Sequence, residues 1–269
     1  MGAPDWRAAV RIQPEPLRES DLLARLAQGT SESAVWVTDL LDPRPAFYRR
    51  RVRVPVSPER RARQASGRQL HALIGSALAA PGVLEVRVRR EGVVGQIDLL
   101  EKEPTELKTT ESLPDPGTLR SSRASYLDQL GLYGALTGRD RGRLVVVEVV
   151  EGAPRRCQVY LVRFRAASEL LDEMRRRARA FRAADEQNTP RDLPRCAWFG
   201  RGCEFQEARA CECRGDEAPA SDAVVGCVES IDLSEPLGLA LEARLRSLAA
   251  VDVPATIERF RDLLNPRRA

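Results

Sequence analysis

Apolar positions along the chain change their spacing several times, and each change predicts a new structural element. Between residues 66 and 80 they recur at helical spacing, and Pro81 with Gly82 ends that helix. Alternating and continuous apolar runs then predict three strands, over 83–89, 93–100 and 105–110. The chain therefore enters a three-stranded meander directly after a helix.

The same spacing rules extend the prediction toward the C-terminus. They predict a helix closed by Gly138, a hairpin, a long Arg-rich helix and two short helices, over 123–136, 143–150 with 156–164, 166–185, 237–249 and 254–264. This order predicts an α/β fold with a mixed central sheet flanked by helices. We expect an N-terminal arm, a core, a cysteine-rich segment and C-terminal helices, over 1–60, 61–190, 191–227 and 228–269.

The composition predicts a folded protein of the cytoplasm. Of the 269 residues, 43% are hydrophobic and 30% are charged, and no secretory signal begins the chain. No apolar run reaches the ~18 residues that span a bilayer. The 43 basic and 39 acidic residues leave a net charge of only +4, a weak electrostatic footprint for nucleic acid. Lysine occurs only at Lys102 and Lys108, and histidine only at His71, so these rare positions are informative.

Two carboxylates and a lysine gather on the predicted meander. Glu106 and Lys108 alternate along one strand and therefore share a face, while Leu107 points into the core. If the neighbouring strand pairs with it through residues 101–105, Asp98 lies across from Lys108. Carboxylate oxygens suit Mg²⁺ or Mn²⁺, which makes water a stronger acid and neutralises charge on a phosphate. The sequence thus predicts a metal-assisted hydrolytic site.

These residues resemble the motifs of the PD-(D/E)XK nuclease superfamily, RecB-like branch. That branch carries a Gly…His motif on the helix before the sheet, here Gly67 and His71, and Gln-x-x-x-Tyr on the helix after it, here Gln129 and Tyr133. The resemblance covers about residues 66–164 and implies the nuclease fold of that superfamily.

The resemblance also implies a role for each motif residue. It assigns the metal to three side chains and one carbonyl: His71, Asp98, Glu106 and the carbonyl of Leu107. It assigns catalysis to Lys108 together with Asp98 and Glu106. Gln129 and Tyr133 complete the catalytic set by supporting the lysine or the substrate phosphate.

Four cysteines lie close together between residues 196 and 213: Cys196, Cys203, Cys211 and Cys213. Their spacing is wider than a zinc knuckle and favours a 4Fe–4S cluster, with zinc or no metal as alternatives. CRISPR-associated RecB-like exonucleases carry three such cysteines and take a fourth ligand from near the N-terminus. No cysteine precedes Cys157 here, so Cys157 or Cys227 is an alternative ligand.

Arginine clusters and aromatic residues are candidates for DNA contact. The arginines lie at 49–53, 60–63, 87–90 and 175–182, and the stacking candidates are Phe47, Tyr48, Trp198 and Phe199. By resemblance, we expect a metal-dependent nuclease that trims single-stranded DNA ends for CRISPR spacer acquisition, with an integrase complex as partner and no membrane contact. The alternatives are a DNA repair or phage recombination exonuclease and a DNA-binding scaffold that does not cut.

Overall fold

The computed structural model describes most of the chain between residues 34 and 249. The described residues are 34–55, 71, 74–75, 83–150, 153–194, 203–211 and 223–249. By its contacts the chain divides into two compact units, Met1–Ala34 and Val35–Ala269, and all described residues except Ala34 fall in the second. Among the described helices, none is long and apolar enough to cross a membrane.

A seven-stranded sheet forms the centre of this second unit. Its strands are β1 (Val35–Trp36), β2 (Leu84–Arg90), β3 (Val93–Leu100), β4 (Pro104–Thr110), β5 (Arg141–Val150), β6 (Ala153–Phe164) and β7 (Val228–Leu233). The strand order is β1-β3-β4-β5-β6-β7, and β2 pairs with β3. The β1–β3 and β4–β5 pairs are parallel and the others are antiparallel, so the predicted mixed sheet is confirmed.

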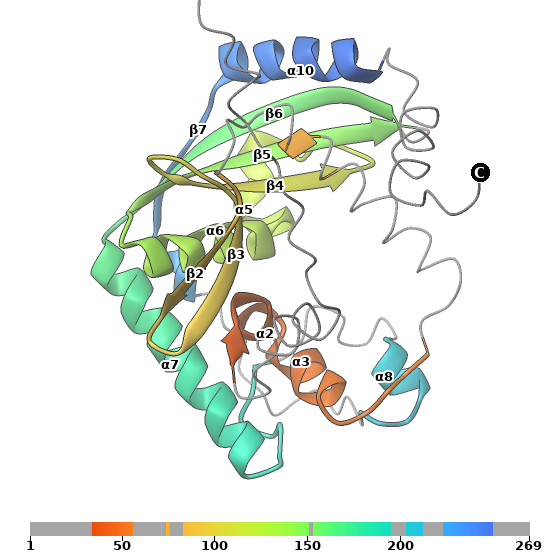
Figure 1. Ribbon diagram of the computed structural model, residues 1–269, viewed down its shortest axis with the longest axis vertical. Coiled ribbons are helices and arrows are strands. Elements are labelled where there is room, and N and C mark those ends of the chain that lie inside the picture. Colours follow the sequence, from red (N-terminus) through yellow and green to blue (C-terminus); the bar gives the residue numbers. More distant parts are fainter. Residues whose placement is uncertain are drawn as a thin grey trace, which may run out of the picture. The chain divides into compact units, whose positions relative to one another are not determined.

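Helices cover both faces of the sheet (Figure 1). The described helices are α2 (Val37–Leu41), α3 (Pro43–Arg49), α5 (Leu119–Ser122), α6 (Ala124–Thr137), α7 (Ala167–Glu186), α8 (Glu204–Glu207), α9 (Ala223–Gly226) and α10 (Glu235–Ala249), with a 3-10 turn at Pro116–Thr118. Of these, α6 packs on one face of the sheet and α10 on the other. Gly138 ends α6 in the left-handed conformation at φ +69°, as the sequence predicts. The predicted α/β class is therefore confirmed in its element types as well.

The core has one cluster of buried side chains on each side of the sheet. Leu130, Tyr133 and Phe164 belong to the cluster under α6 and α7, and Val145 and Leu241 belong to the one under α10. Because β5 is buried on both faces, its sequence is a continuous apolar run rather than an alternating one.

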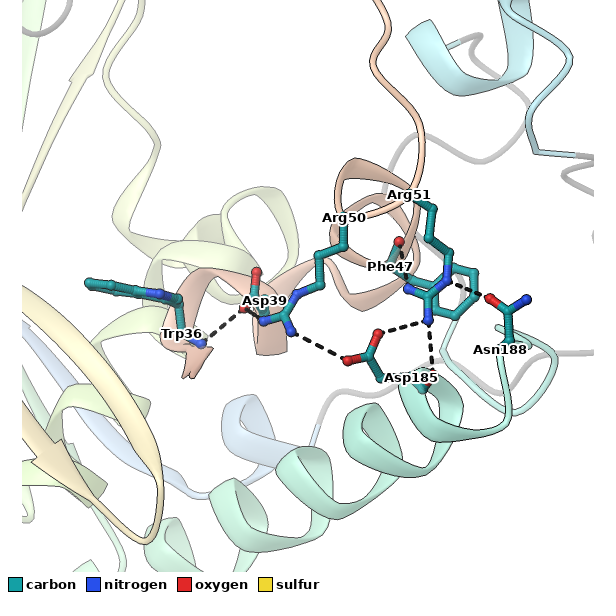
Figure 2. Close-up of polar contacts among 7 residues, drawn as sticks. All are labelled: Trp36, Asp39, Phe47, Arg50, Arg51, Asp185 and Asn188. Carbon is teal, nitrogen blue, oxygen red and sulfur yellow. Dashed lines mark hydrogen bonds and ion pairs between the residues drawn. The ribbon is translucent and has the colours of Figure 1, made fainter. Parts of the chain in front are cut away.

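Ionic contacts hold the segment β1-α2-α3 against α7 (Figure 2). The Arg50 guanidinium lies 2.7 Å from Asp39 Oδ2 and 3.5 Å from Asp185 Oδ2, and Arg51 lies 2.8 Å from the other Asp185 oxygen. Phe47 lies under Arg51 and is only 3% exposed, so the prediction that Phe47 stacks on DNA bases is wrong. Phe47 is a core residue.

The C-terminal part differs from the sequence prediction. We expected only helices after residue 228, but β7 (Val228–Leu233) extends the sheet by pairing antiparallel with β6. Glu229 and Asp232 interrupt its apolar pattern, which hides the strand in the sequence. The predicted helix over 66–80 is described only at 71, 74 and 75, which are helical, and the helix predicted over 254–264 lies outside the described residues.

Candidate active site

The site lies where β3 and β4 separate. The two strands pair only at Leu99 with Thr105 and at Leu100 with Pro104. Beyond these pairs, side chains satisfy the backbone groups in place of the ladder, as buried backbone groups require. The Asp98 carboxylate accepts the Leu107 N–H at 2.7 Å, and the Tyr133 hydroxyl donates to the carbonyl of Gln96 at 2.6 Å. Beyond Leu99 and Thr105 the strands β3 and β4 therefore diverge, and polar groups lie between them. We call this region, with Asp98, Glu106 and Lys108, the fork.

The fork corrects the expected position of Asp98. In the observed register, Leu99 lies opposite Thr105, so Asp98 lies opposite Glu106 rather than opposite Lys108. The prediction pairs Glu101 with Thr105, whereas the structure pairs Leu100 with Pro104, one position earlier on each strand. The two carboxylates are consequently closer to each other than the sequence suggests, while Lys108 lies further along its strand.

His71 completes a set of three donor atoms. Its Nε2 lies 3.2 Å from Asp98 Oδ2 and 3.3 Å from the carbonyl oxygen of Leu107. Neighbouring ligands of a Mg²⁺ ion with bonds of about 2.1 Å lie about 3 Å apart in an octahedron. The hydrogen bond to Asp98 raises the pKa of His71, although burial opposes that shift. A divalent ion in this position would displace that imidazole proton.

The environment of the Glu106 carboxylate is also suited to a nearby divalent ion. Glu106 is 1% exposed, Oε1 pairs with the Lys108 ammonium, and Oε2 is buried with no hydrogen-bond partner. Burial raises the pKa of Glu106 to about 8 against the opposing charge of Lys108. A cation beside Oε2 would satisfy this oxygen and stabilise the ionised form. His71, Asp98 and the Leu107 carbonyl therefore fit a divalent ion, and Glu106 is a further carboxylate on the same strand as Leu107.

A chain of hydrogen bonds fixes Lys108. Its ammonium donates to Gln129 Oε1 at 2.8 Å, and the Gln129 amide donates to the Tyr133 hydroxyl at 2.9 Å. Gln129 and Tyr133 lie one turn apart on α6, as their spacing predicts. Burial would lower the pKa of Lys108, but the carboxylates of Glu106 and Asp98 outweigh it and raise that pKa. Lys108 is thus a fixed, charged donor.

Close packing brings α6 to the fork. A Cβ atom on Gly95 would lie 2.4 Å from the Leu136 side chain and 3.3 Å from the Tyr133 ring. Any larger residue at this position would push the helix, with Gln129, away from Lys108. The glycine that precedes Gln96 in the sequence therefore sets the distance between the helix and the site.

Tyr126 is a site neighbour that the sequence analysis missed. The Lys108 ammonium lies 5.4 Å from the centre of its ring, and the Arg123 guanidinium lies 6.0 Å from the same centre. Tyr126 precedes Gln129 by three residues, which is the spacing of one helix face. That spacing is the signal that could have found it.

The predicted cysteine cluster is described only in part. Cys203 is half-buried before α8 and Cys211 is buried after it, whereas Cys196 and Cys213 lie outside the described residues. Cys227 is buried near Arg165 and Glu169, and burial raises the pKa of Cys157 to about 12. Within the described ranges, no three His, Cys, Asp or Glu side chains form a group that could hold a metal. In the fork, the third donor beside His71 and Asp98 is a main-chain carbonyl.

Comparison with known proteins adds little to this geometry. No family model matches the sequence, and no curated protein matches it. The crystal structure of SSO0001 is similar, with 20% identity and a TM-score of 0.49, and the match covers 74% of this chain and 98% of that chain. Because likeness at this level supports no functional conclusion, the proposed function depends on the site itself.

Proposed function

We propose that the protein is a metal-dependent DNA nuclease that hydrolyses phosphodiester bonds, of the PD-(D/E)XK superfamily and its RecB-like branch. One observation carries the proposal: His71 Nε2 lies 3.2 Å from Asp98 Oδ2 and 3.3 Å from the Leu107 carbonyl oxygen, on the strand that also carries the buried Glu106 and the half-buried Lys108. The buried carboxylate of Glu106 adds to this observation, because a cation would satisfy its second oxygen and stabilise its ionised form.

The residues divide the work of hydrolysis among them. His71, Asp98, Glu106 and the Leu107 carbonyl would hold Mg²⁺ or Mn²⁺. When bound, such an ion makes water a stronger acid and neutralises the charge that builds on the phosphate. Lys108 donates a hydrogen bond to the attacking water or to a phosphate oxygen, and Gln129 holds its ammonium in place.

The proposed substrate is DNA with single-stranded ends, and the proposed role is trimming such ends before spacer integration with a CRISPR integrase complex. A DNA repair or phage recombination exonuclease would use the same site. A DNA-binding scaffold that does not cut is the remaining alternative. The presence of Asp98, Glu106 and Lys108 together favours a cutting enzyme over this scaffold, because a module that does not cut has no chemical need for that set.

Metal-dependent cleavage of single-stranded DNA tests the proposal. The purified protein should cut an end-labelled oligonucleotide with Mg²⁺ or Mn²⁺ and should not cut it in EDTA. Asp98→Asn and Glu106→Gln should each slow cleavage at least about a hundredfold, since a metal ion supplies several kcal/mol of charge stabilisation. Cleavage that persists in EDTA, or that survives both substitutions, would contradict the proposal.

We also propose a metal site at Cys196, Cys203, Cys211 and Cys213, a 4Fe–4S cluster with zinc as the alternative. Anaerobically purified protein should absorb broadly near roughly 400 nm, where thiolate-bound iron absorbs. Cys203→Ser should remove that absorption. Cys157→Ser should retain it, because Cys157 is packed inside β6. A colourless protein with bound zinc would exclude the iron–sulfur cluster, and a protein with neither metal would exclude the site.

A further inference from the structure

One face of strands β1, β2 and β3 leads along β3 to the fork. Arg87 pairs with Gln96, and both Arg89 and Trp36 pair with Val94. Side chains of directly paired residues lie on the same face of a sheet, and alternate residues of a strand share a face. Trp36, Arg87, Arg89 and Gln96 therefore lie on one face, which we call the hairpin face, and Asp98 follows Gln96 by two residues along β3.

The opposite face of β3 is closed by α6. Ile97 is fully buried, and Gly95 lies directly against Leu136. On the hairpin face, by contrast, Arg87, Arg89 and Gln96 are exposed. The hairpin face is therefore the side of these strands that a ligand can reach.

Two arginines of the hairpin face have no ion-pair partner among the described residues. Among the described residues, neither Arg87 nor Arg89 has a carboxylate within ion-pair distance, and Glu85 accepts a hydrogen bond from the Gln96 amide at 3.2 Å. Arg90 points to the other side and donates to the carbonyl of Ala135. Two free guanidinium groups on adjacent alternate positions suit the phosphates of a nucleic acid strand.

Trp36 supplies a fixed aromatic ring on this face. Its backbone N–H donates to Asp39 at 2.9 Å, and Arg50 holds that carboxylate in turn. Figure 2 shows the indole ring pointing away from this ionic cluster. The ring is half-buried, and the Arg87 guanidinium lies 5.3 Å from its centre. A half-buried tryptophan beside an arginine that has no ion-pair partner among the described residues is an arrangement on which a nucleic acid base can stack.

We propose that the hairpin face binds the single strand of the DNA substrate, with one base stacked on Trp36 and phosphates on Arg87 and Arg89. This inference rests on the proposed nuclease function and extends it to a binding path. The four-residue step from Val94 to Asp98 covers about 13 Å of strand. At a rise of about 3.4 Å per stacked nucleotide, this is a span of about four nucleotides.

Binding and cleavage by variants of the hairpin face test the inference. In EDTA, where no cleavage should occur, Trp36→Ala should weaken binding of a labelled oligo-dT of about 20 nucleotides about tenfold, the size of one base–aromatic stack. Trp36→Phe should recover most of that affinity. Arg87→Ala should weaken binding. It should also reduce the slope of log affinity against log salt concentration by about one, because one phosphate contact is lost.

The control is Arg163→Ala, which removes an exposed strand arginine from β6, away from the hairpin face. It should bind as the wild type does. If the wild type cuts DNA but Trp36→Ala and Arg87→Ala bind and cut as it does, the binding path is wrong and the nuclease function stands. If the wild type neither binds nor cuts single-stranded DNA, the function fails and the path fails with it.

Discussion

Glu106 is the side chain whose position is hardest to explain by stability alone. It is almost fully buried, and one of its oxygens has no hydrogen-bond partner in the part of the chain that the structure describes. Leaving such a charge unsatisfied costs more free energy than a single ion pair recovers. Glu106→Gln should therefore not lower the free energy of unfolding, although activity is lost. This opposition between stability and activity is typical of a functional site.

His71 is the residue whose role as a metal ligand can be measured separately from catalysis. His71→Ala should raise the Mn²⁺ concentration needed for half-maximal cleavage by about tenfold or more, because one donor of the set is lost. Calorimetric titration of the protein with Mn²⁺ should show the same weakening without any DNA present. An unchanged Mn²⁺ affinity in both measurements would show that His71 only packs beside Asp98.

At the scale of elements, the sequence predicts helices and strands that have a local apolar pattern. It does not predict the strand register at Asp98, which depends on where the pairing of β3 with β4 ends. The strand β3 and the helix α6 follow from apolar spacing, and Gln129 and Tyr133 follow from helical periodicity. The register at Asp98 does not, because backbone groups in the fork are satisfied by side chains from other elements. The strand β7 was hidden because pairing with β6 overrides its interrupted pattern.

A buried ionic cluster joins α6 to α7. Arg177 Nε lies 2.6 Å from Glu173 Oε1 and its NH2 group lies 3.3 Å from Asp128 on α6. Removing one partner from a buried cluster leaves uncompensated charge, so Arg177→Met should lower the free energy of unfolding by about 3–5 kcal/mol. Urea denaturation followed by circular dichroism measures this loss. A loss below about 1 kcal/mol would show that the ionic cluster contributes little to the stability of the protein.

The same cluster predicts a pH dependence of stability. Burial would raise the pKa of Glu173, but hydrogen bonds from Arg176 and Arg177 outweigh it and leave that pKa lowered. The stabilisation is therefore complete above the ordinary glutamate pKa of about 4.3 and is lost as the pH falls through the lowered value. Urea midpoints between pH 7 and pH 3 should fall less steeply for Glu173→Gln than for the wild type. Glu186→Gln, an exposed position on the same helix, should behave as the wild type does.

At the scale of the whole molecule, the sheet and the helices on it position the fork, the support of Lys108 and Trp36. The separation of β3 from β4 creates the fork, α6 carries the residues that hold Lys108, and the contacts of α3 with α7 fix the segment that presents Trp36. The sequence alone indicated the motif residues of the fork, since they are chemically distinctive. It did not indicate Trp36, because nothing local shows that β1 pairs with β3. Long-range pairing of a two-residue strand leaves no periodic signal.

The two lysines of the chain provide the most direct measurement of the central claim. Lys108 is bonded to Glu106 and Gln129 in the fork, whereas Lys102 is exposed in the turn between β3 and β4. In a Mn²⁺-dependent cleavage assay on single-stranded DNA, Lys108→Ala should lose at least about a hundredfold in rate, the effect of removing one preorganised donor. Lys102→Ala should cut as the wild type does. Equal melting temperatures would show that both variants fold, and full activity in a folded Lys108→Ala protein would contradict the assignment of this site as a nuclease centre.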